Sequence, residues 1–186
     1  MTLIEYHFIE GCKQGDASAQ QQLYETYLPY LLTIVRRFGI QEQNIADLMQ
    51  EIFVEIFLNI EKYDPSKGEF KYWVKVIAIR KTLKYLHKIR PTPLLNLSQI
   101  KQEEISIDQD FEELETAYII KMISELPEQY RTVFNLHTID GYSHKEISQQ
   151  LGIQVVSSRS RLSRAKKMLR QKLLQYWKNN KLHGVF

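Results

Sequence analysis

Apolar residues recur along most of this chain at intervals of three and four, the spacing that places them on one face of an α-helix. Runs of β-branched residues with a period of two, which would indicate strands, are missing from the sequence. The pattern predicts helices over residues 2–12, 16–38, 44–60 and 69–89, with a turn at 63–68. We therefore expect an all-α protein.

The helical pattern fails between residues 91 and 111, where two prolines and many polar side chains stand. This composition is typical of a linker. Helical periodicity resumes over residues 111–124, and Pro127 suits the first turn of the next helix. We expect two small helical domains joined by a flexible acidic linker and followed by a tail, with these boundaries: 1–90, 91–111, 112–178 and 179–186.

Residues 143–174 carry the pattern of a helix-turn-helix. Ser143 and Glu146 have the spacing of a capping box, which predicts the start of a helix. Gly152 stands where a left-handed residue would end that helix, and Ser157 is expected to cap the next one. A short helix, a tight turn and a longer helix are typical of DNA-binding proteins.

The second of these helices is expected to bury one stripe and to expose a basic one. The apolar stripe comprises Leu162, Ala165, Leu169 and Leu173. No acidic residue lies between Ser157 and Tyr176, and arginine suits both guanine edges and phosphates. A solvated basic face on a bundle helix is the alternative. The expected DNA contacts are Arg159, Ser160, Arg161, Arg164, Lys166 and Lys167.

Helix 44–60, which Asn44 is expected to cap, has two apolar faces. Its core face comprises Ile45, Met49, Ile52, Phe53, Ile56 and Ile60. A helix with a second face that mixes apolar and acidic residues is typical of one that docks on a partner, although a fully buried central helix is the alternative. The second face comprises Asp47, Gln50, Glu51, Val54 and Leu58.

Helix 69–89 combines basic side chains with aromatic ones. Its expected core stripe is Tyr72, Val76, Ile79, Leu83 and Leu86. Cations interleaved with aromatic rings suit a single nucleic-acid strand whose bases stack, although most of these rings also suit the core. The expected strand contacts are Trp73, Arg80, Lys81, Lys84 and Lys88.

The net charge of +3, from 25 basic and 22 acidic side chains, conceals an alternation along the chain. Residues 69–90 hold seven basic and one acidic side chain, and residues 131–186 hold eleven and two. Residues 1–68 and 91–130 are acidic. Two separated basic blocks indicate two places that contact a polyanion, with two solvated helix faces as the alternative.

Several classes of protein are disfavoured. A single cysteine, Cys12, excludes a disulfide scaffold and a cysteine-rich zinc module, and the five histidines show no ligand spacing beyond the unremarkable pair His137 and His144. No apolar run is long enough to span a bilayer, and the first residues lack the basic start of a secretory signal. A phosphate-binding glycine loop and a nucleophile elbow are also missing. We expect a cytoplasmic, non-enzymatic protein with no cofactor, metal site or catalytic residue and no membrane contact of its own.

Two blocks of this sequence resemble the bacterial sigma-70 family. The stretches LPEQYRTVF (126–134), DGYSHKEI (140–147), LGI (151–153) and SRLSRAK (160–166) resemble region 4 of its small extracytoplasmic-function (ECF) group. Family members commonly carry Gly-Thr where this chain has Val156-Ser157, and an apolar residue at the position of Ser158. The stretch DLMQE (47–51), followed by Phe53, resembles region 2.2, while FKYWV (70–74) and IAIR (77–80) resemble regions 2.3 and 2.4.

The resemblance implies an ECF-type sigma factor that binds core RNA polymerase and directs promoter-specific initiation. Its implied partners are the β′ clamp helices, the β flap, promoter DNA and an anti-sigma factor. The resemblance also implies that the second face of helix 44–60 docks on β′, that segment 63–88 opens and reads the −10 element, and that helix 157–174 reads the −35 element. A monomer is expected. The alternative is a stand-alone dimeric helix-turn-helix regulator that binds a palindrome without polymerase.

Overall fold

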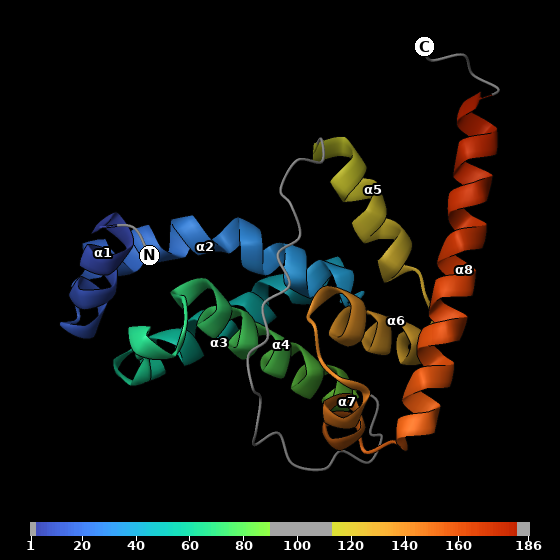
Figure 1. Ribbon diagram of the computed structural model, residues 1–186. Coiled ribbons are helices and arrows are strands. Elements are labelled where there is room, and N and C mark those ends of the chain that lie inside the picture. The colour runs from blue at the N-terminus through green and yellow to red at the C-terminus, as the bar shows by residue number, and fades with distance from the viewer. Residues whose placement is uncertain (1–2, 90–112, 182–186) are drawn as a thin grey trace. The chain divides into compact units, whose positions relative to one another are not determined.

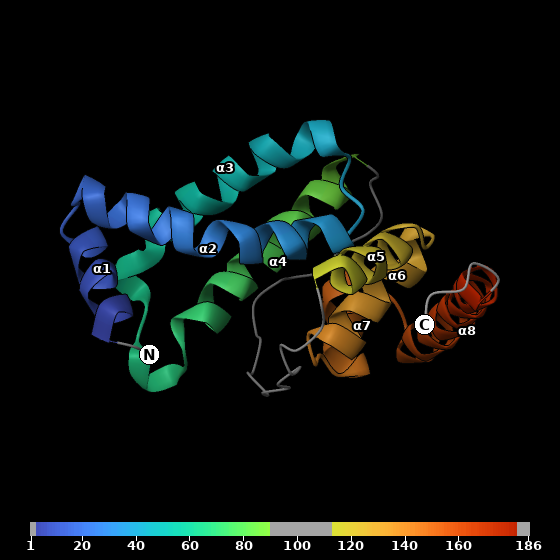
Figure 2. The same cartoon turned by 90° about the horizontal axis from the view of Figure 1, so that it is seen from above.

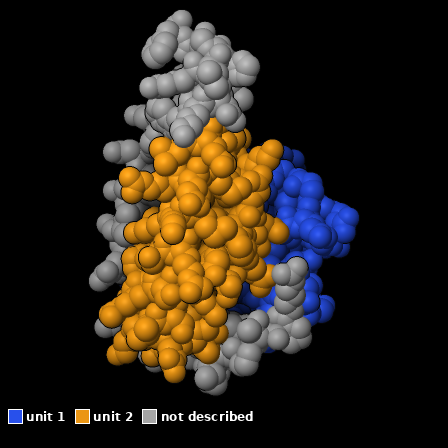
Figure 3. Space-filling model, turned by 90° about the vertical axis from the view of Figure 1, so that its right-hand side faces the viewer, with its two compact units in different colours: residues 1–36, 40–91 blue, residues 37–39, 92–186 orange. Residues whose placement is uncertain are grey.

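The computed structural model describes the backbone of residues 3–89 and 113–181, and the side chains of residues 7–89 and 117–176. All regular elements in these ranges are helical, which confirms the expected all-α class (Figure 1). The chain divides into two compact units, coloured in Figure 3: unit 1 is residues 1–36 and 40–91, and unit 2 is residues 37–39 and 92–186. The expected linker, 91–111, lies outside the described residues.

The described residues of unit 1 form four α-helices and two 3₁₀ turns. The elements are α1 (Leu3–Lys13), α2 (Ala17–Arg37), α3 (Glu42–Asn59), η1 (Ile60–Lys62), η2 (Pro65–Lys67) and α4 (Phe70–Ile89). Helices α2, α3 and α4 lie alongside one another (Figure 2), and aromatic rings join them. Tyr24 of α2 contacts Phe53 of α3 at 4.5 Å between ring centroids, and Tyr27 of α2 contacts Phe70 of α4 at 5.4 Å.

The core of unit 1 follows the expected stripe on α3 but not on α4. All six expected core residues of α3 and η1 are buried. On α4, however, Tyr72 and Val76 are only half-buried, so their assignment to the core was wrong. The core positions of α4 are Phe70, Val74, Ala78, Ile79, Thr82, Leu83 and Leu86. The series starts at Phe70 because that ring packs against Tyr27 and Tyr63, which rotates the buried face away from Tyr72.

The start of α3 also differs from the sequence expectation. Asn44 does not cap this helix, because its N–H already donates to the carbonyl of Gln41 at 2.8 Å, within the first turn. Helix α3 begins at Glu42, with Gln41 in the N-cap position and without a side-chain cap. The extended backbone of Gln41, rather than a capping side chain, marks the boundary.

Unit 2 contains the helix-turn-helix. Its described elements are α5 (Glu113–Ser124), α6 (Glu128–Phe134), a π-helical turn η3 (Asn135–Ile139), α7 (His144–Leu151) and α8 (Val155–Lys181). Met122, Ile123 and Leu126 pack against Ala165 and Leu169 of α8 to form a hydrophobic cluster. Pro127 occupies the N-cap position of α6 rather than its first turn, with an extended ψ of 136°.

The entry to the helix-turn-helix agrees with the sequence, but its second helix starts earlier than expected. The Ser143–Glu146 capping box is complete, and Gly152 ends α7 in the left-handed conformation, with φ 62° and ψ 33°. Ser157 was expected to cap α8 but lies inside its first turn, because the helix begins at Val155 and the N–H of Ser158 already donates to the carbonyl of Gln154.

The apolar stripe of α8 is shorter than expected. Leu162, Ala165 and Leu169 are buried, but Leu173 is 39% exposed, so its assignment to the core was wrong. The hydrophobic cluster ends at Leu169, and beyond it α8 meets α5 through Lys172 and Tyr176 instead. Among the helices of the described segments, none combines the length and the apolar character needed to cross a membrane.

Candidate nucleic-acid interface and docking face

Helix α3 exposes the mixed face that the sequence predicts. Asp47, Gln50 and Glu51 are exposed, and Val54 and Leu58 beside them are 55% and 75% exposed. We call these five residues the docking face. Burying a leucine or valine side chain that is more than half exposed would stabilise a complex by roughly 1.5–3 kcal/mol. An unpartnered apolar pair ringed by acidic and amide groups is typical of a surface that binds another protein.

Helix α8 exposes a cationic stripe opposite its buried residues. Of the six expected DNA contacts, five are exposed and Arg161 is half-buried. We call these six residues (Arg159, Ser160, Arg161, Arg164, Lys166 and Lys167) the cationic stripe. Arg164 is the member that the structure fixes most clearly, because its Nη1 donates to the hydroxyl of Tyr130 in α6 at 3.2 Å. No sequence pattern signals this contact, because it joins residues 34 positions apart.

The five expected strand contacts of α4 fall into two groups. Lys84 and Lys88 are exposed and face solvent. Lys81 instead pairs with Glu55 of α3, with 3.0 Å between Nζ and the carboxylate, and is only 22% exposed. Arg80 and Trp73 are half-buried. Of the three lysines that the sequence indicated, Lys84 and Lys88 are therefore exposed, and Lys81 is paired, within the described part of the chain.

Trp73 belongs to an aromatic cluster at the start of α4. Its ring lies 5.4 Å from that of Phe70 and 5.8 Å from that of Tyr63, measured between centroids. Lys71, two residues before Trp73 on α4, places its Nζ 4.9 Å from the centre of the Tyr30 ring. Phe70 and Tyr63 are buried, whereas Trp73 keeps part of its surface exposed, so this ring offers a stacking surface anchored on two buried ones.

The turn before α4 is held by its own hydrogen bonds. The Asp64 carboxylate accepts from the N–H of Ser66 at 3.0 Å and from its hydroxyl at 2.7 Å, and it pairs with Lys67 at 3.2 Å. These bonds, the Ser66 hydroxyl first, lower the pKa of Asp64 below its usual value. The hydroxyl of Tyr63 donates to the carbonyl of Gly68, which has a positive φ of 141°. The sequence indicated a turn here but not this network.

His137 and His144, whose spacing in the sequence is unremarkable, lie beside the cationic stripe. The rings of His137 and His144 stack with centroids 4.3 Å apart. Burial, followed by the charge of Lys166, lowers the pKa of His137. Burial also lowers the pKa of His144, and His137, Arg159 and Lys166 add to that effect. Both imidazoles are therefore neutral at neutral pH, within reach of residues assigned to DNA binding.

The described side chains show little other reactive chemistry. Three or more histidine, cysteine, aspartate or glutamate side chains placed to hold a metal ion are not found among them. The buried Cys12 has its pKa raised to about 11, by desolvation first and by the charge of Asp16 second. Its thiol therefore stays protonated at neutral pH and is a poor nucleophile.

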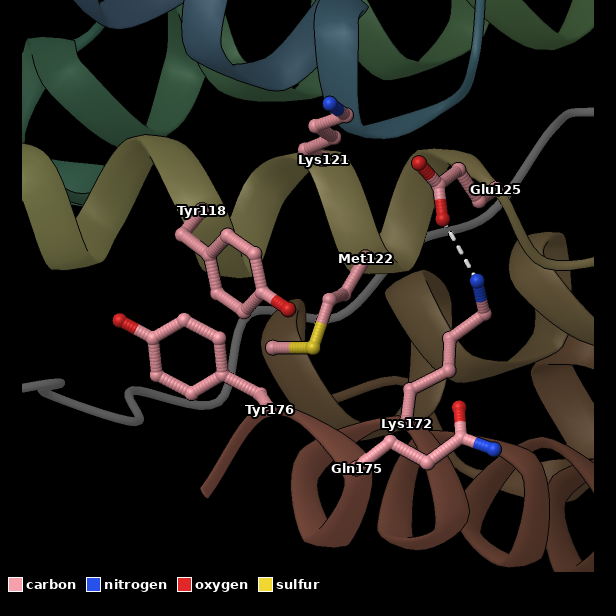
Figure 4. A pocket seen from close by; sticks show the side chains of 7 residues that line it. All are labelled: Tyr118, Lys121, Met122, Glu125, Lys172, Gln175 and Tyr176. Atoms are coloured by element: carbon pink, nitrogen blue, oxygen red, sulfur yellow. Dashed lines mark hydrogen bonds and ion pairs between the residues drawn. The ribbon is translucent and has the colours of Figure 1, made fainter. Parts of the chain in front are cut away.

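A pocket of about 360 Å³ lies between α5 and the distal part of α8 (Figure 4). The rings of Tyr118 and Tyr176 stack at 4.1 Å on one side, and the Glu125–Lys172 ion pair closes the other at 2.5 Å. The sulfur-containing side chain of Met122 lies between them. This site is separate along α8 from the cationic stripe.

Comparison with known families matches both halves of the chain. The family described as "Sigma-70 region 2" matches residues 23–92, and the one described as "Sigma-70, region 4" matches residues 116–169. The two matches stand in the order that the sequence resemblance implies, and together they span most of the chain. This chain belongs to the sigma-70 family. Region 2 of the family contains the docking face and the aromatic cluster, and region 4 contains most of the helix-turn-helix.

Two relatives of this chain are sigma factors of the ECF group. It is 28% identical to the ECF RNA polymerase sigma factor SigW of Bacillus subtilis over 177 residues, covering 89% of this chain and 94% of SigW. It is 26% identical to the ECF RNA polymerase sigma-E factor of Escherichia coli K12 over 184 residues, covering 92% and 95%. Both alignments run across regions 2 and 4, as the ECF resemblance implies.

A solved structure supports the fold. The structure of CnrH in complex with the cytosolic domain of CnrY covers 91% of this chain and 97% of CnrH, with a TM-score of 0.51 and 24% sequence identity. This likeness concerns the arrangement of helices.

Proposed function

We propose that this chain is an ECF-type sigma factor that binds core RNA polymerase and directs transcription initiation from promoters with matched −35 and −10 elements. The proposal rests on two chemically different exposed surfaces. One lies in region 2, to which we assign binding of core polymerase, and the other lies in region 4, to which we assign recognition of the −35 element. The docking face mixes apolar and acidic groups within region 2, and the cationic stripe lies on the second helix of the helix-turn-helix in region 4.

The proposed division of labour follows residues 1–90, 91–111 and 112–178. The docking face binds the β′ clamp helices of polymerase, and residues 116–140 contact the β flap. The linker threads toward the active-site and RNA-exit channels. Residues 179–186 form a tail with no assigned task.

DNA is read at two places in this proposal. The cationic stripe enters the major groove of the −35 element, where arginine side chains contact base edges and phosphates. Segment 63–88 opens the −10 element, with Trp73 as a stacking surface and Arg80, Lys81, Lys84 and Lys88 as the basic contacts. Lys84 and Lys88 are the stronger candidates of these four, because Lys81 is engaged with Glu55.

Strand opening is driven by binding free energy in this proposal, and the chain itself is not an enzyme. An anti-sigma factor is the expected regulatory partner. Support for a protein partner comes from the likeness to CnrH, which was solved in complex with the cytosolic domain of CnrY. The chain is proposed to act in the cytoplasm as a monomer.

Reconstituted transcription tests this proposal. The purified chain is mixed with core RNA polymerase and a library of random promoter sequences, and the start sites of the transcripts are mapped. Initiation at defined sites that requires both the chain and the core enzyme supports the proposal. Footprints on palindromic DNA without polymerase, from a dimeric chain that forms no stable complex with core enzyme, would instead identify a stand-alone regulator.

A further inference from the structure

Three elements of the helix-turn-helix unit meet at a pair of histidines. His137 comes from η3 and His144 from the first turn of α7, and their ring planes are inclined by 36° at a centroid distance of 4.3 Å. The Nδ1 atom of His144 lies 2.9 Å from the hydroxyl oxygen of Ser158, in the first turn of α8. One imidazole therefore connects η3, α7 and the helix that carries the cationic stripe.

Ser158 gives this connection its importance. Its side chain is completely buried, and a buried hydroxyl needs a hydrogen-bond partner. His144 supplies that partner, so the two side chains fix the first turn of α8 against α7. Arg159, the first member of the cationic stripe, follows directly in the sequence, and its backbone position depends on the same turn.

The charges around the histidine pair are almost all positive. Arg159 and Lys166 of α8 act on His144, and Lys166 also acts on His137. On α7, Lys145 is exposed. The Glu146 carboxylate accepts hydrogen bonds from the backbone N–H of Ser143 at 2.8 Å and from its hydroxyl at 2.7 Å. In the absence of DNA the neutral form of each imidazole is favoured, because burial and the neighbouring cations oppose a further positive charge and because His137 also acts on His144.

We propose that His137 and His144 form a proton-binding part of the DNA interface, and that His144 is a positioning residue for the first turn of α8. This inference rests on the proposed function, because it requires DNA phosphates to lie against Arg159 and Lys166. A phosphate there offsets the two cations that oppose protonation and adds a negative charge that favours the imidazolium form.

The sign of the resulting pH dependence follows from linkage. The pKa of each histidine is higher in the DNA complex than in the free chain, so the complex holds more protons. DNA affinity therefore rises as the pH falls through the pKa of the complex, and it levels off below the pKa of the free chain. One linked proton changes the affinity by up to about tenfold per pH unit within that window.

Nuclear magnetic resonance tests the proton-binding step directly. The imidazole signals of the full-length chain are titrated with pH, alone and with a saturating 20-base-pair duplex of mixed sequence at low salt. We expect DNA to raise the pKa of both His137 and His144, by about one unit each. Unchanged pKa values at His137 and His144, with backbone signals of residues 159–167 shifted by the duplex, would overturn the inference and leave the DNA-binding proposal standing.

The same titration separates this failure from that of the proposed function. If saturating duplex leaves the signals of residues 159–167 unshifted, the cationic stripe is not the DNA surface, and both proposals for unit 2 are wrong. Binding of the chain to core polymerase, measured separately, then decides whether the proposed role of unit 1 survives.

Two substitutions test the positioning role. His144→Asn retains a hydrogen-bonding group near the position of Nδ1 but cannot titrate, so we expect duplex affinity within about twofold of the natural chain at pH 8 and a flatter profile down to pH 5.5. His144→Ala removes the partner of Ser158, and we expect weaker binding at every pH. Fluorescence anisotropy supplies the dissociation constants, and His7→Gln is the matched control.

Each variant has an outcome that contradicts the inference. An undiminished pH dependence in His144→Asn would show that this imidazole is not the proton-binding group. Natural affinity at pH 8 in a folded His144→Ala variant would show that His144 does not position α8.

Discussion

The docking face of α3 and the cationic stripe of α8 are built on the same helical plan but expose different chemistry. Each helix buries one stripe, which includes Ile52 on α3 and Ala165 on α8, both fully inaccessible to solvent. The opposite side of α3 presents Val54 and Leu58 among acidic groups, whereas that of α8 presents arginine and lysine. The two helices are therefore alike in burying an apolar stripe and differ in the charge of the side that they expose.

The two surfaces should also respond differently to salt. Apolar burial on the docking face is short-ranged and nearly independent of ionic strength, whereas phosphate contacts release counterions and weaken steeply as salt rises.

The largest effect is expected from Arg164→Glu. This substitution places a negative charge in the middle of the cationic stripe, where it repels phosphate, and we expect initiation dependent on the −35 element to fall about 100-fold or more. Binding to core polymerase should be unchanged, as measured by co-elution of the chain with the core enzyme. If the variant loses core binding instead, the roles assigned to the two surfaces are wrong.

Val54→Asp tests the docking face of α3. It introduces a charge where we expect an apolar contact, and affinity for core polymerase should fall about 10- to 100-fold, while duplex binding by the free chain is retained. Leu174→Asp is a matched control, because Val54 and Leu174 are both 55% exposed and Leu174 lies outside both surfaces. Equal losses for the two variants would mean that the docking face has no special role.

A smaller effect should distinguish the lysines of α4 that contact the −10 strand from the one that does not. Lys84→Gln should weaken open-complex formation about three- to tenfold, because Lys84 is exposed and free to neutralise a phosphate. Lys81→Gln should change it less than about twofold, since this lysine already pairs with Glu55. Permanganate footprinting of the −10 region measures opening. The reverse order of the two variants would contradict our reading of the ion pair.

A modest effect is also expected at the contact between Tyr130 and Arg164. Tyr130→Phe removes only the hydroxyl that accepts from the Arg164 guanidinium, and we expect affinity for −35 duplex to fall about two- to threefold at constant stability. In an Arg164→Gln background the same substitution should have no further effect, because the contact is already lost. Additive losses would show that Tyr130 acts independently of Arg164.

The sequence predicted the helices well where their boundaries depend on local chemistry. The Ser143 capping box and the left-handed Gly152 require only residues close together in the chain, and both predictions are confirmed. The burial of α3 was also correct, because its apolar positions are large and regularly spaced. Helix boundaries at Asn44 and Ser157 were wrong, since residues suited to capping were present but backbone hydrogen bonds began earlier.

Contacts between distant residues could not be predicted from the pattern. Thr82 is fully buried on α4 although its hydropathy does not favour the core; this local case is settled by the hydrogen bond that its hydroxyl donates to the carbonyl of Ala78 at 2.8 Å. The same limit applies to the candidate sites. The spacing identified Lys81 as basic and outward, but its pairing with Glu55 depends on the packing of α4 against α3.

The length of α8 separates the cationic stripe from the pocket beside Tyr176. About 18 Å of helix axis separate Arg164 from Tyr176, at a rise of about 1.5 Å per residue. This distance is about twice the range over which physiological salt leaves charges able to sense one another, about 8 Å. A change of charge near Tyr176 is thus largely screened at Arg164, so the pocket between α5 and α8 and the centre of the cationic stripe are electrostatically almost independent of each other.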